Sequence, residues 1–116
     1  MEKHSVVFLI NSEEKWPSLL RHVEILAANA GAVNQLAVVA INSSILSCLK
    51  SMNIVEQRQQ LEVLSQKGIQ LFICGNTCKR YGITADQILP FFTVAVEGGI
   101  AKILSLEAEG FKLIQE

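Results

Sequence analysis

The sequence has no long apolar run. Its longest are Val6 to Ile10 and Leu36 to Ile41, far short of the roughly 18 residues that span a bilayer. The apolar run near the start is also too short for a signal peptide, and no small-residue cleavage site follows it. We therefore expect a cytoplasmic protein without a membrane helix.

Several binding signatures are missing as well. Neither a P-loop nor a G-x-G-x-x-G turn occurs, so we expect no nucleotide and no other cofactor. Ten Lys and Arg against eleven Asp and Glu give a net charge of −1, whereas nucleic-acid binders normally show a basic stripe. His4 and His22 stand alone without a second ligand at metal spacing. These absences argue against nucleic-acid and metal sites.

Cysteine is scarce, with three residues in the chain. An odd number of cysteines in a reducing compartment indicates free thiols, not disulfides. A chain of 116 residues, half of them hydrophobic, is long enough to bury a core without such bridges. We expect a single domain over residues 1–116.

Short apolar runs alternate with helical spacings along the chain. The expected strands are Ser5–Ile10, Leu36–Ile41, Ile69–Cys74, Thr93–Val96 and Phe111–Ile114. The first expected helix is Trp16–Ala30, closed by Gly31, and a short helical piece capped by Ser43 or Ser44 runs through Leu49. The next helix is capped by Asn53 and runs to Lys67, with core positions Ile54, Leu61 and Leu64 and with Gly68 as its stop. The last two are a helix from Gly75 to near Gly82 and a helix over Ile100–Glu109, closed by Gly110. This alternation predicts an α/β fold whose parallel sheet carries helices on both faces, with ligand chemistry at the carboxyl ends of the strands.

The segment from Cys74 to Arg80 holds the strongest candidate site. Cys74 ends a strand where a helix begins, so unpaired N–H groups and the positive end of the helix dipole favour its thiolate. Gly75 lets the backbone approach a bound group, Asn76 or Thr77 offers capping and hydrogen bonds, and Lys79 and Arg80 add positive potential. The alternative is that Cys74 is a buried small hydrophobe that ends a strand.

Two other features leave alternatives open. Cys78 fits helix packing better than a second redox thiol, because the two-residue spacing of thioredoxin-like pairs is absent. Cys48 lies in an apolar connector and is expected to be inert. Gly98 and Gly99 fit a tight strand-to-helix turn, our default, although their amides could also bind an anion.

The motif Cys74-Gly75-Asn76-Thr77, with Lys79-Arg80 and Gly82-Ile83, resembles the strand-to-helix signature of the DsrE/DsrF/DsrH group of sulfur-relay proteins. Val6–Asn11 resembles the first strand of that family with its terminal Asn, Asp86–Pro90 its acidic-then-Leu-Pro loop, and Ile100–Ile114 its last helix and strand. Cys78 stands where Leu or Met is usual in that family. Ile41-Asn42 lacks the usual His-Gly or Asn-Gly.

The resemblance implies a three-layer α/β/α sandwich with a mainly parallel five-stranded sheet, Rossmann-like in type. It also implies homo-oligomers, with trimers or hexamers favoured, and a strand-end cysteine, here Cys74, that carries sulfur as a persulfide. Asn11 and Asn42 join the candidate substrate-binding residues as the ends of the first two strands.

Two functions from different classes follow from these expectations. In the first, Cys74 takes sulfane sulfur from a donor protein and passes it to an acceptor protein. In the second, the protein is a non-catalytic homo-oligomeric binding or adaptor subunit, and Cys74 is structural. For self-association we expect Ile25, opposite the core stripe of the first helix, to lie under another copy of the chain.

Overall fold

A computed structural model of the protein describes residues 3–29, 31–52 and 54–116. Its five strands are β1 (His4–Ile10), β2 (Val33–Ala40), β3 (Gln70–Cys74), β4 (Thr93–Ala95) and β5 (Phe111–Gln115). They form one sheet in the order β4-β3-β2-β1-β5, and every neighbouring pair is parallel. The predicted five-stranded parallel sheet is confirmed, and all its carboxyl ends meet at one edge.

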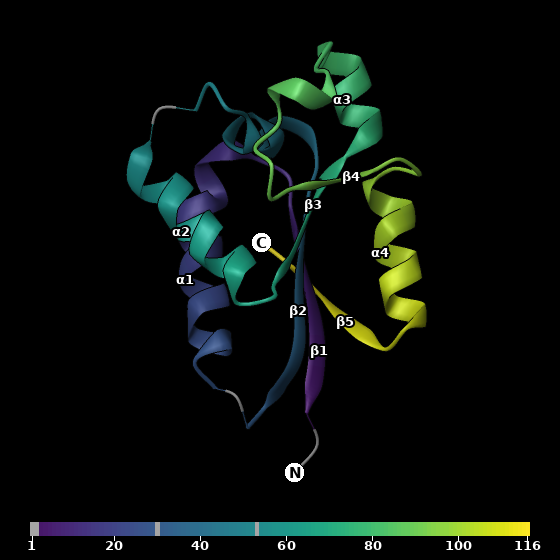
Figure 1. Ribbon diagram of the computed structural model, residues 1–116. Coiled ribbons are helices and arrows are strands. Elements are labelled where there is room, and N and C mark those ends of the chain that lie inside the picture. Colours follow the sequence, from purple (N-terminus) through teal and green to yellow (C-terminus); the bar gives the residue numbers. More distant parts are fainter. Residues whose placement is uncertain (1–2, 30, 53) are drawn as a thin grey trace.

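Helices cover both faces of this sheet (Figure 1). The α-helices are α1 (Trp16–Ala27), α2 (Val55–Gln66), α3 (Gly75–Tyr81) and α4 (Gly99–Ala108), and the 3-10 helices are η1 (Glu13–Lys15), η2 (Asn42–Cys48) and η3 (Ala85–Gln87). Figure 1 shows α1 and α2 on one face, α4 on the other, and α3 beyond the end of β3. The three-layer sandwich is therefore confirmed.

The two faces bury unequal cores. The core on the α1 and α2 side is built around large, fully buried side chains such as Trp16, Phe8 and Leu19. The core under α4 is smaller and consists of Val7, Leu9, Ala37, Val39, Phe72, Ile103, Leu106 and Phe111. A buried parallel strand needs apolar side chains on both faces, which is why β1 and β2 appear as continuous apolar runs.

Some helix boundaries differ from the sequence expectations. The first helix ends at Ala27, so Gly31 does not close it, and the predicted member Ala30 and the predicted cap Asn53 lie outside the described residues. Ile54 is 58% exposed and not in the core, because α2 begins after it at Val55. Gln57 is buried in that part of the fold instead.

The piece after β2 also differs in its start. It is a 3-10 helix that begins after Ile41, and neither Ser43 nor Ser44 caps it with a side chain. The Ser44 hydroxyl donates instead to the carbonyl oxygens of Ile10 at 2.9 Å and Ile41 at 2.7 Å. This serine therefore ties together the ends of β1 and β2.

Helix α4 leaves an apolar stripe uncovered. Ile103 and Leu106 face the sheet, whereas Ile100 and Leu104 are 58% and 63% exposed. Residues four apart lie on one side of a helix. Together with Val96 just before the helix, which is 77% exposed, these two residues form what we call the α4 stripe (Val96, Ile100 and Leu104).

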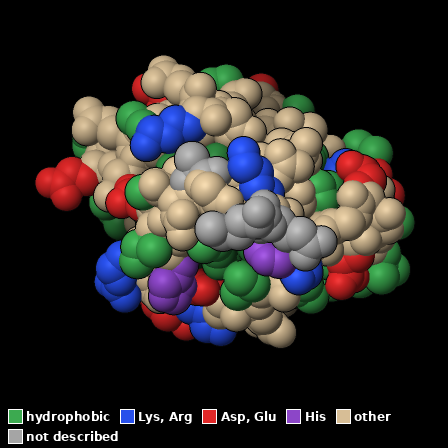
Figure 2. Space-filling model, turned by 90° about the horizontal axis from the view of Figure 1, so that it is seen from below, with side chains coloured by type: hydrophobic (Ala, Val, Ile, Leu, Met, Phe, Trp, Pro, Cys, Tyr) green, Lys and Arg blue, Asp and Glu red, His purple; other side chains and the backbone are tan. Residues whose placement is uncertain are grey.

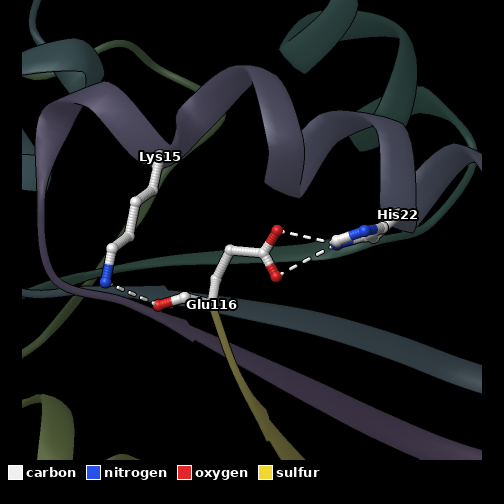
Figure 3. A network of polar contacts seen from close by, with 3 residues as sticks. All are labelled: Lys15, His22 and Glu116. Carbon is white, nitrogen blue, oxygen red and sulfur yellow. Dashed lines mark hydrogen bonds and ion pairs between the residues drawn. The ribbon is translucent and has the colours of Figure 1, made fainter.

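The end of β5 is fastened to the first helical segment (Figure 3). Lys15 Nζ donates to the Glu116 carbonyl oxygen at 3.1 Å, and His22 Nδ1 lies 2.7 Å from the Glu116 carboxylate.

Figure 2 shows the opposite, amino-terminal edge of the sheet, where acidic, basic and hydrophobic side chains are interspersed. The charged side chains on this visible face therefore do not form a large patch of a single sign.

Candidate functional site

Cys74 lies at the carboxyl edge of the sheet, where β3 passes directly into α3. It is the last residue of the strand and also the residue from which the helix starts, with no connecting loop. Pairing of β3 with β4 places Cys74 opposite Ala95, so the turn after β4 returns to the same point. Segments distant in sequence therefore meet at one sulfur atom.

Several hydrogen-bond donors surround the Cys74 sulfur. The backbone N–H of Gly99 donates to Cys74 Sγ at 3.2 Å, and the Thr77 hydroxyl and the N–H groups of Thr77 and Asn76 also reach it. Burial by itself would raise the pKa of Cys74, but these hydrogen bonds favour the thiolate and lower that pKa below its ordinary value. The arrangement stabilises an anionic sulfur.

The close approach of the residue 99 backbone to Cys74 requires a glycine at this position. A Cβ atom added to Gly99 would lie 2.4 Å from Ile41 Cγ2 and 3.3 Å from the Cβ of Cys74. Gly98 has a φ of 99°, and a Cβ there would lie 2.6 Å from Asn76 Nδ2. The Gly-Gly pair thus does more than turn the chain, because it lets an amide reach the sulfur.

Gly99→Ala is expected to destabilise the protein by about 1–3 kcal/mol, because the new methyl group must displace Ile41 or α4. The same displacement moves the amide from Cys74, so alkylation of this thiol at neutral pH should slow. Thermal unfolding and iodoacetamide kinetics measure the two effects. Gly31→Ala is the matched control, since a Cβ there would meet no atom of the described residues beyond its chain neighbours closer than 4.0 Å. Equal stability of both variants would contradict the close approach.

A cavity of about 280 Å³ opens beside Cys74. Arg80 Nη2 donates to Asn42 Oδ1 at 3.1 Å and lies 3.4 Å from Thr77 Oγ1. The N–H of Asn42 donates to Thr77 Oγ1 at 3.3 Å, and Asn42 itself has a φ of 53°. The lining is Ile41, Asn42, Cys74, Asn76, Thr77, Arg80, Glu97, Gly98, Gly99, Ile100 and Ala101. A guanidinium thus lines the cavity into which the thiol opens.

The structure gathers part of the predicted set. Asn42, Asn76, Thr77 and Arg80 line the cavity with Cys74, whereas Asn11, Gly75, Lys79 and Cys78 do not. Asn11 instead accepts a hydrogen bond from Lys15 Nζ at 3.2 Å. Gly75 is needed for packing rather than for access to a ligand, because a Cβ there would lie 2.8 Å from the Ala95 carbonyl oxygen. Lys79 and Cys78 line a separate cavity of about 220 Å³ on another side of α3.

Sequence reasoning missed the segment from Glu97 to Ala101 as part of this cavity. Its only signal was the Gly-Gly pair, for which we favoured a simple turn. The predicted tight turn is present, because the Gly98 N–H donates to the Ala95 carbonyl oxygen at 3.0 Å. The Gly99 N–H donates instead to the Cys74 sulfur, so this one amide also fits the other interpretation, in which it faces an anion. In the described ranges, no cluster of three or more His, Cys, Asp or Glu residues is arranged to hold a metal ion.

The other two thiols have a different environment. Cys48 is fully buried. Its pKa is raised well above the ordinary value, mainly by burial and secondly by the charge of the nearby Cys78. The pKa of Cys78 is also raised, mainly by burial and secondly by the charge of Cys74. Both side chains pack within the core on the α1 and α2 side, as expected. Cys74 alone of the three has a lowered pKa.

Iodoacetamide is expected to modify Cys74 roughly tenfold faster than Cys78, and Cys48 most slowly, because the thiolate is the reactive form. The lowered pKa of Cys74 also means that its rate should become half-maximal at a lower pH than the rate of a free cysteine. Peptide mapping by mass spectrometry over a pH series measures both quantities. Faster modification of Cys48 or Cys78 would contradict the order.

The chain is similar to known proteins over nearly its whole length. A model of the DsrE/DsrF-like family matches residues 4–115. A solved protein of unknown function from Methanobacterium thermoautotrophicum is 25% identical, with a TM-score of 0.87 over 98% of this chain and 100% of that chain. The same fold occurs in the ychN protein of E. coli, which is 14% identical with a TM-score of 0.78 over 99% of this chain and 100% of that one. It also occurs in a conserved protein of unknown function from Bacteroides thetaiotaomicron, which is 16% identical with a TM-score of 0.71 over 97% of this chain and 94% of that one. No curated protein sequence matches significantly.

Proposed function

Because the chain belongs to the DsrE/DsrF-like family, which is generally linked to sulfur relay, we propose that it carries sulfane sulfur as a persulfide on Cys74. The observation that carries this proposal is the hydrogen bond of 3.2 Å from the Gly99 N–H to Cys74 Sγ. An amide from another element, aimed at a sulfur whose pKa is lowered, supports an anionic sulfur more than a packing role.

The transfer step needs no outside oxidant or reductant. The Cys74 thiolate attacks the outer sulfur of a donor persulfide, R–S–SH, and a new S–S bond forms as the donor S–S bond breaks. The donor leaves as the thiolate R–S⁻ with the electron pair of the broken bond. A thiolate of an acceptor protein then attacks the outer sulfur held on Cys74, which regenerates the Cys74 thiolate.

The residues around the cavity have separate tasks in this scheme. The N–H groups of Asn76, Thr77 and Gly99 stabilise negative charge on Cys74. Arg80, held by Asn42 and Thr77, supplies a positive charge at the rim for a persulfide or for an anionic donor. Lys79 has no part, because it lies outside this cavity.

The test is the mass of the intact protein after incubation with a small persulfide donor. We expect an adduct of one sulfur atom, about 32 Da, that maps to Cys74 and is removed by a thiol reductant. Absence of the adduct under conditions in which free cysteine peptides are modified would refute the carrier function.

The adaptor function remains a second candidate, since one observation favours it. Cys74 is only 6% exposed, so its sulfur meets solvent only through the cavity. If Cys74 were structural, it would resist both alkylation and sulfur loading while the protein kept its assembly. The mass experiment therefore separates the two candidates.

We propose that copies of the chain associate through the α4 stripe. Family members are often oligomeric. Ile25 is 62% exposed, but its neighbours on α1, such as Arg21 and Glu24, are polar and exposed. The α4 stripe has more apolar surface in one place, and its residue Ile100 also lines the Cys74 cavity. A trimer or hexamer assembled there would bring each partner copy to the rim of the site.

The cellular location and the domain limits stay predictions. The described residues include no helix long and apolar enough to cross a membrane. All three cysteines are free, and free thiols suit the reducing cytoplasm in which we propose that the protein acts. We keep residues 1–116 as one domain.

A further inference from the structure

A second cavity, of about 540 Å³, lies on the α1 and α2 side of the fold. It opens between η1, η2 and the start of α2, away from Cys74, and has the volume of a typical small-ligand site. The lining consists of Glu13, Glu14, Pro17, Leu46, Ser47, Leu49, Ser51, Met52, Ile54 and Gln57. We call it the η1–η2 cavity.

A buried amide without a partner lines this cavity. Gln57 is 7% exposed, and within the described residues its Nε2 atom has no hydrogen-bond partner. A buried donor without an acceptor is costly, and native folds rarely keep one without a reason. An acceptor atom on a bound molecule would remove that cost.

The rim carries negative charge. Glu13 and Glu14 are exposed, and neither forms an ion pair within the part of the chain that the structure describes. The neighbouring Lys15 is already engaged with Asn11 and the Glu116 carbonyl oxygen. The two carboxylates therefore remain available to a cation.

The remaining lining is mainly apolar. Leu46 and Ile54 are 38% and 58% exposed, so the cavity offers uncovered hydrophobic surface. Arg58 Nη2 donates to the carbonyl oxygens of Lys50 and Met52, which holds the wall of the cavity in place. An occupant must combine an apolar group, a cation and a hydrogen-bond acceptor.

We propose that the η1–η2 cavity binds a short segment of a partner protein in which a Leu-like side chain neighbours Lys or Arg. The apolar side chain fills the cavity, and the cation reaches Glu13 and Glu14. A peptide group offers both an acceptor and a donor, so it satisfies the Gln57 amide in either orientation. Neither a simple amine nor an apolar ligand meets all three demands.

The position of η2 gives this docking site a relation to Cys74. Asn42, at the start of η2, lines the Cys74 cavity, whereas Leu46 and Ser47, later in the same helix, line the η1–η2 cavity. A 3-10 helix rises about 2 Å per residue, so the residues that line the two cavities lie roughly 8–10 Å apart along η2. A segment bound here holds its protein beside Cys74. The binding itself needs no sulfur chemistry, so it can fail or succeed independently of the carrier function.

The test is an NMR titration of the full-length, isotope-labelled protein with the peptide Ac-Gly-Leu-Lys-Leu-Arg-Gly-NH2. We expect saturable shifts of the Gln57 side-chain amide and of backbone amides in η1 and η2. The control peptide, with Glu in place of Lys and Arg, should bind at least about fivefold more weakly. No saturation at millimolar peptide, equal binding of both peptides, or shifts confined to α4 or the Cys74 cavity would each overturn the proposal.

Two variants separate binding from folding. Glu13→Gln with Glu14→Gln should weaken the basic peptide by roughly fivefold and leave thermal stability unchanged. Gln57→Met should also weaken binding, yet keep or raise the unfolding temperature, because it removes an unsatisfied buried donor. A Gln57 with a purely structural role would give the opposite result, a loss of stability with unchanged binding.

Discussion

Replacing Cys74 with serine is expected to abolish sulfur loading while the fold survives. The serine hydroxyl is close in size and can accept the same Gly99 N–H, so the stability change should stay within about 1 kcal/mol. A hydroxyl is not a sulfur nucleophile, so the adduct of about 32 Da should disappear completely. Intact-protein mass spectrometry and thermal unfolding measure the two effects.

Cys78→Ala is the matched control for this variant. Cys78 lines a different cavity and packs in the core, so its loss should cost about 1–2 kcal/mol and leave loading intact. If Cys78→Ala loses loading as fully as Cys74→Ser does, the two cysteines act as a dithiol pair. The single-thiol mechanism would then be wrong.

Leu104→Asp is expected to break the assembly that we propose on the α4 stripe. Leu104 is 63% exposed in the protomer, so an aspartate there costs little in folding. In a contact between copies the carboxylate would lose its water at a cost of several kcal/mol, which raises the dissociation constant by at least roughly a hundredfold. Light scattering should show a mass near the 12.8 kDa of one chain.

Ile25→Asp is the comparison for the other exposed helix face. Ile25 has nearly the same exposure, 62%, but lies among polar side chains of α1, so this variant should keep the wild-type mass. Dissociation of Ile25→Asp but not of Leu104→Asp would move the interface to α1. A wild-type protein that is already monomeric at micromolar concentration would refute self-association altogether.

The sequence predicted the elements of the fold well and their placement only in part. Continuous apolar runs such as Val6–Ile10 and Leu36–Ile41 indicated buried strands, because a parallel strand covered on both faces exposes no polar side. The strand order could not be predicted, since pairing of β1 with β5 depends on contacts between the two ends of the chain. The buried face of a helix could not be predicted from its periodicity where apolar residues lie on several sides of the helix, as they do in α4. In α4 the periodicity did not show that Ile103 and Leu106 face inward while Leu104 faces out.

The candidate site was predicted as far as it is local in sequence. Cys74 stands at a strand-to-helix junction, and that placement alone indicated donors from Asn76 and Thr77. The contribution of Gly99 could not be predicted, because it is 25 residues away and depends on the pairing of β3 with β4. Lys79 was included for its charge and Asn11 for its strand end, but neither lines the cavity. Adjacency in sequence does not tell which side of α3 a residue takes.

The distance in sequence between Cys74 and Gly99 also has a consequence for the newly made protein. A chain leaves the ribosome from its amino end, so β3 and Cys74 emerge before β4 and α4 are complete. Until those later elements have docked, the cysteine lacks the Gly99 amide that helps to lower its pKa. The chain thus gains the full acidity of this thiol only near the end of biosynthesis.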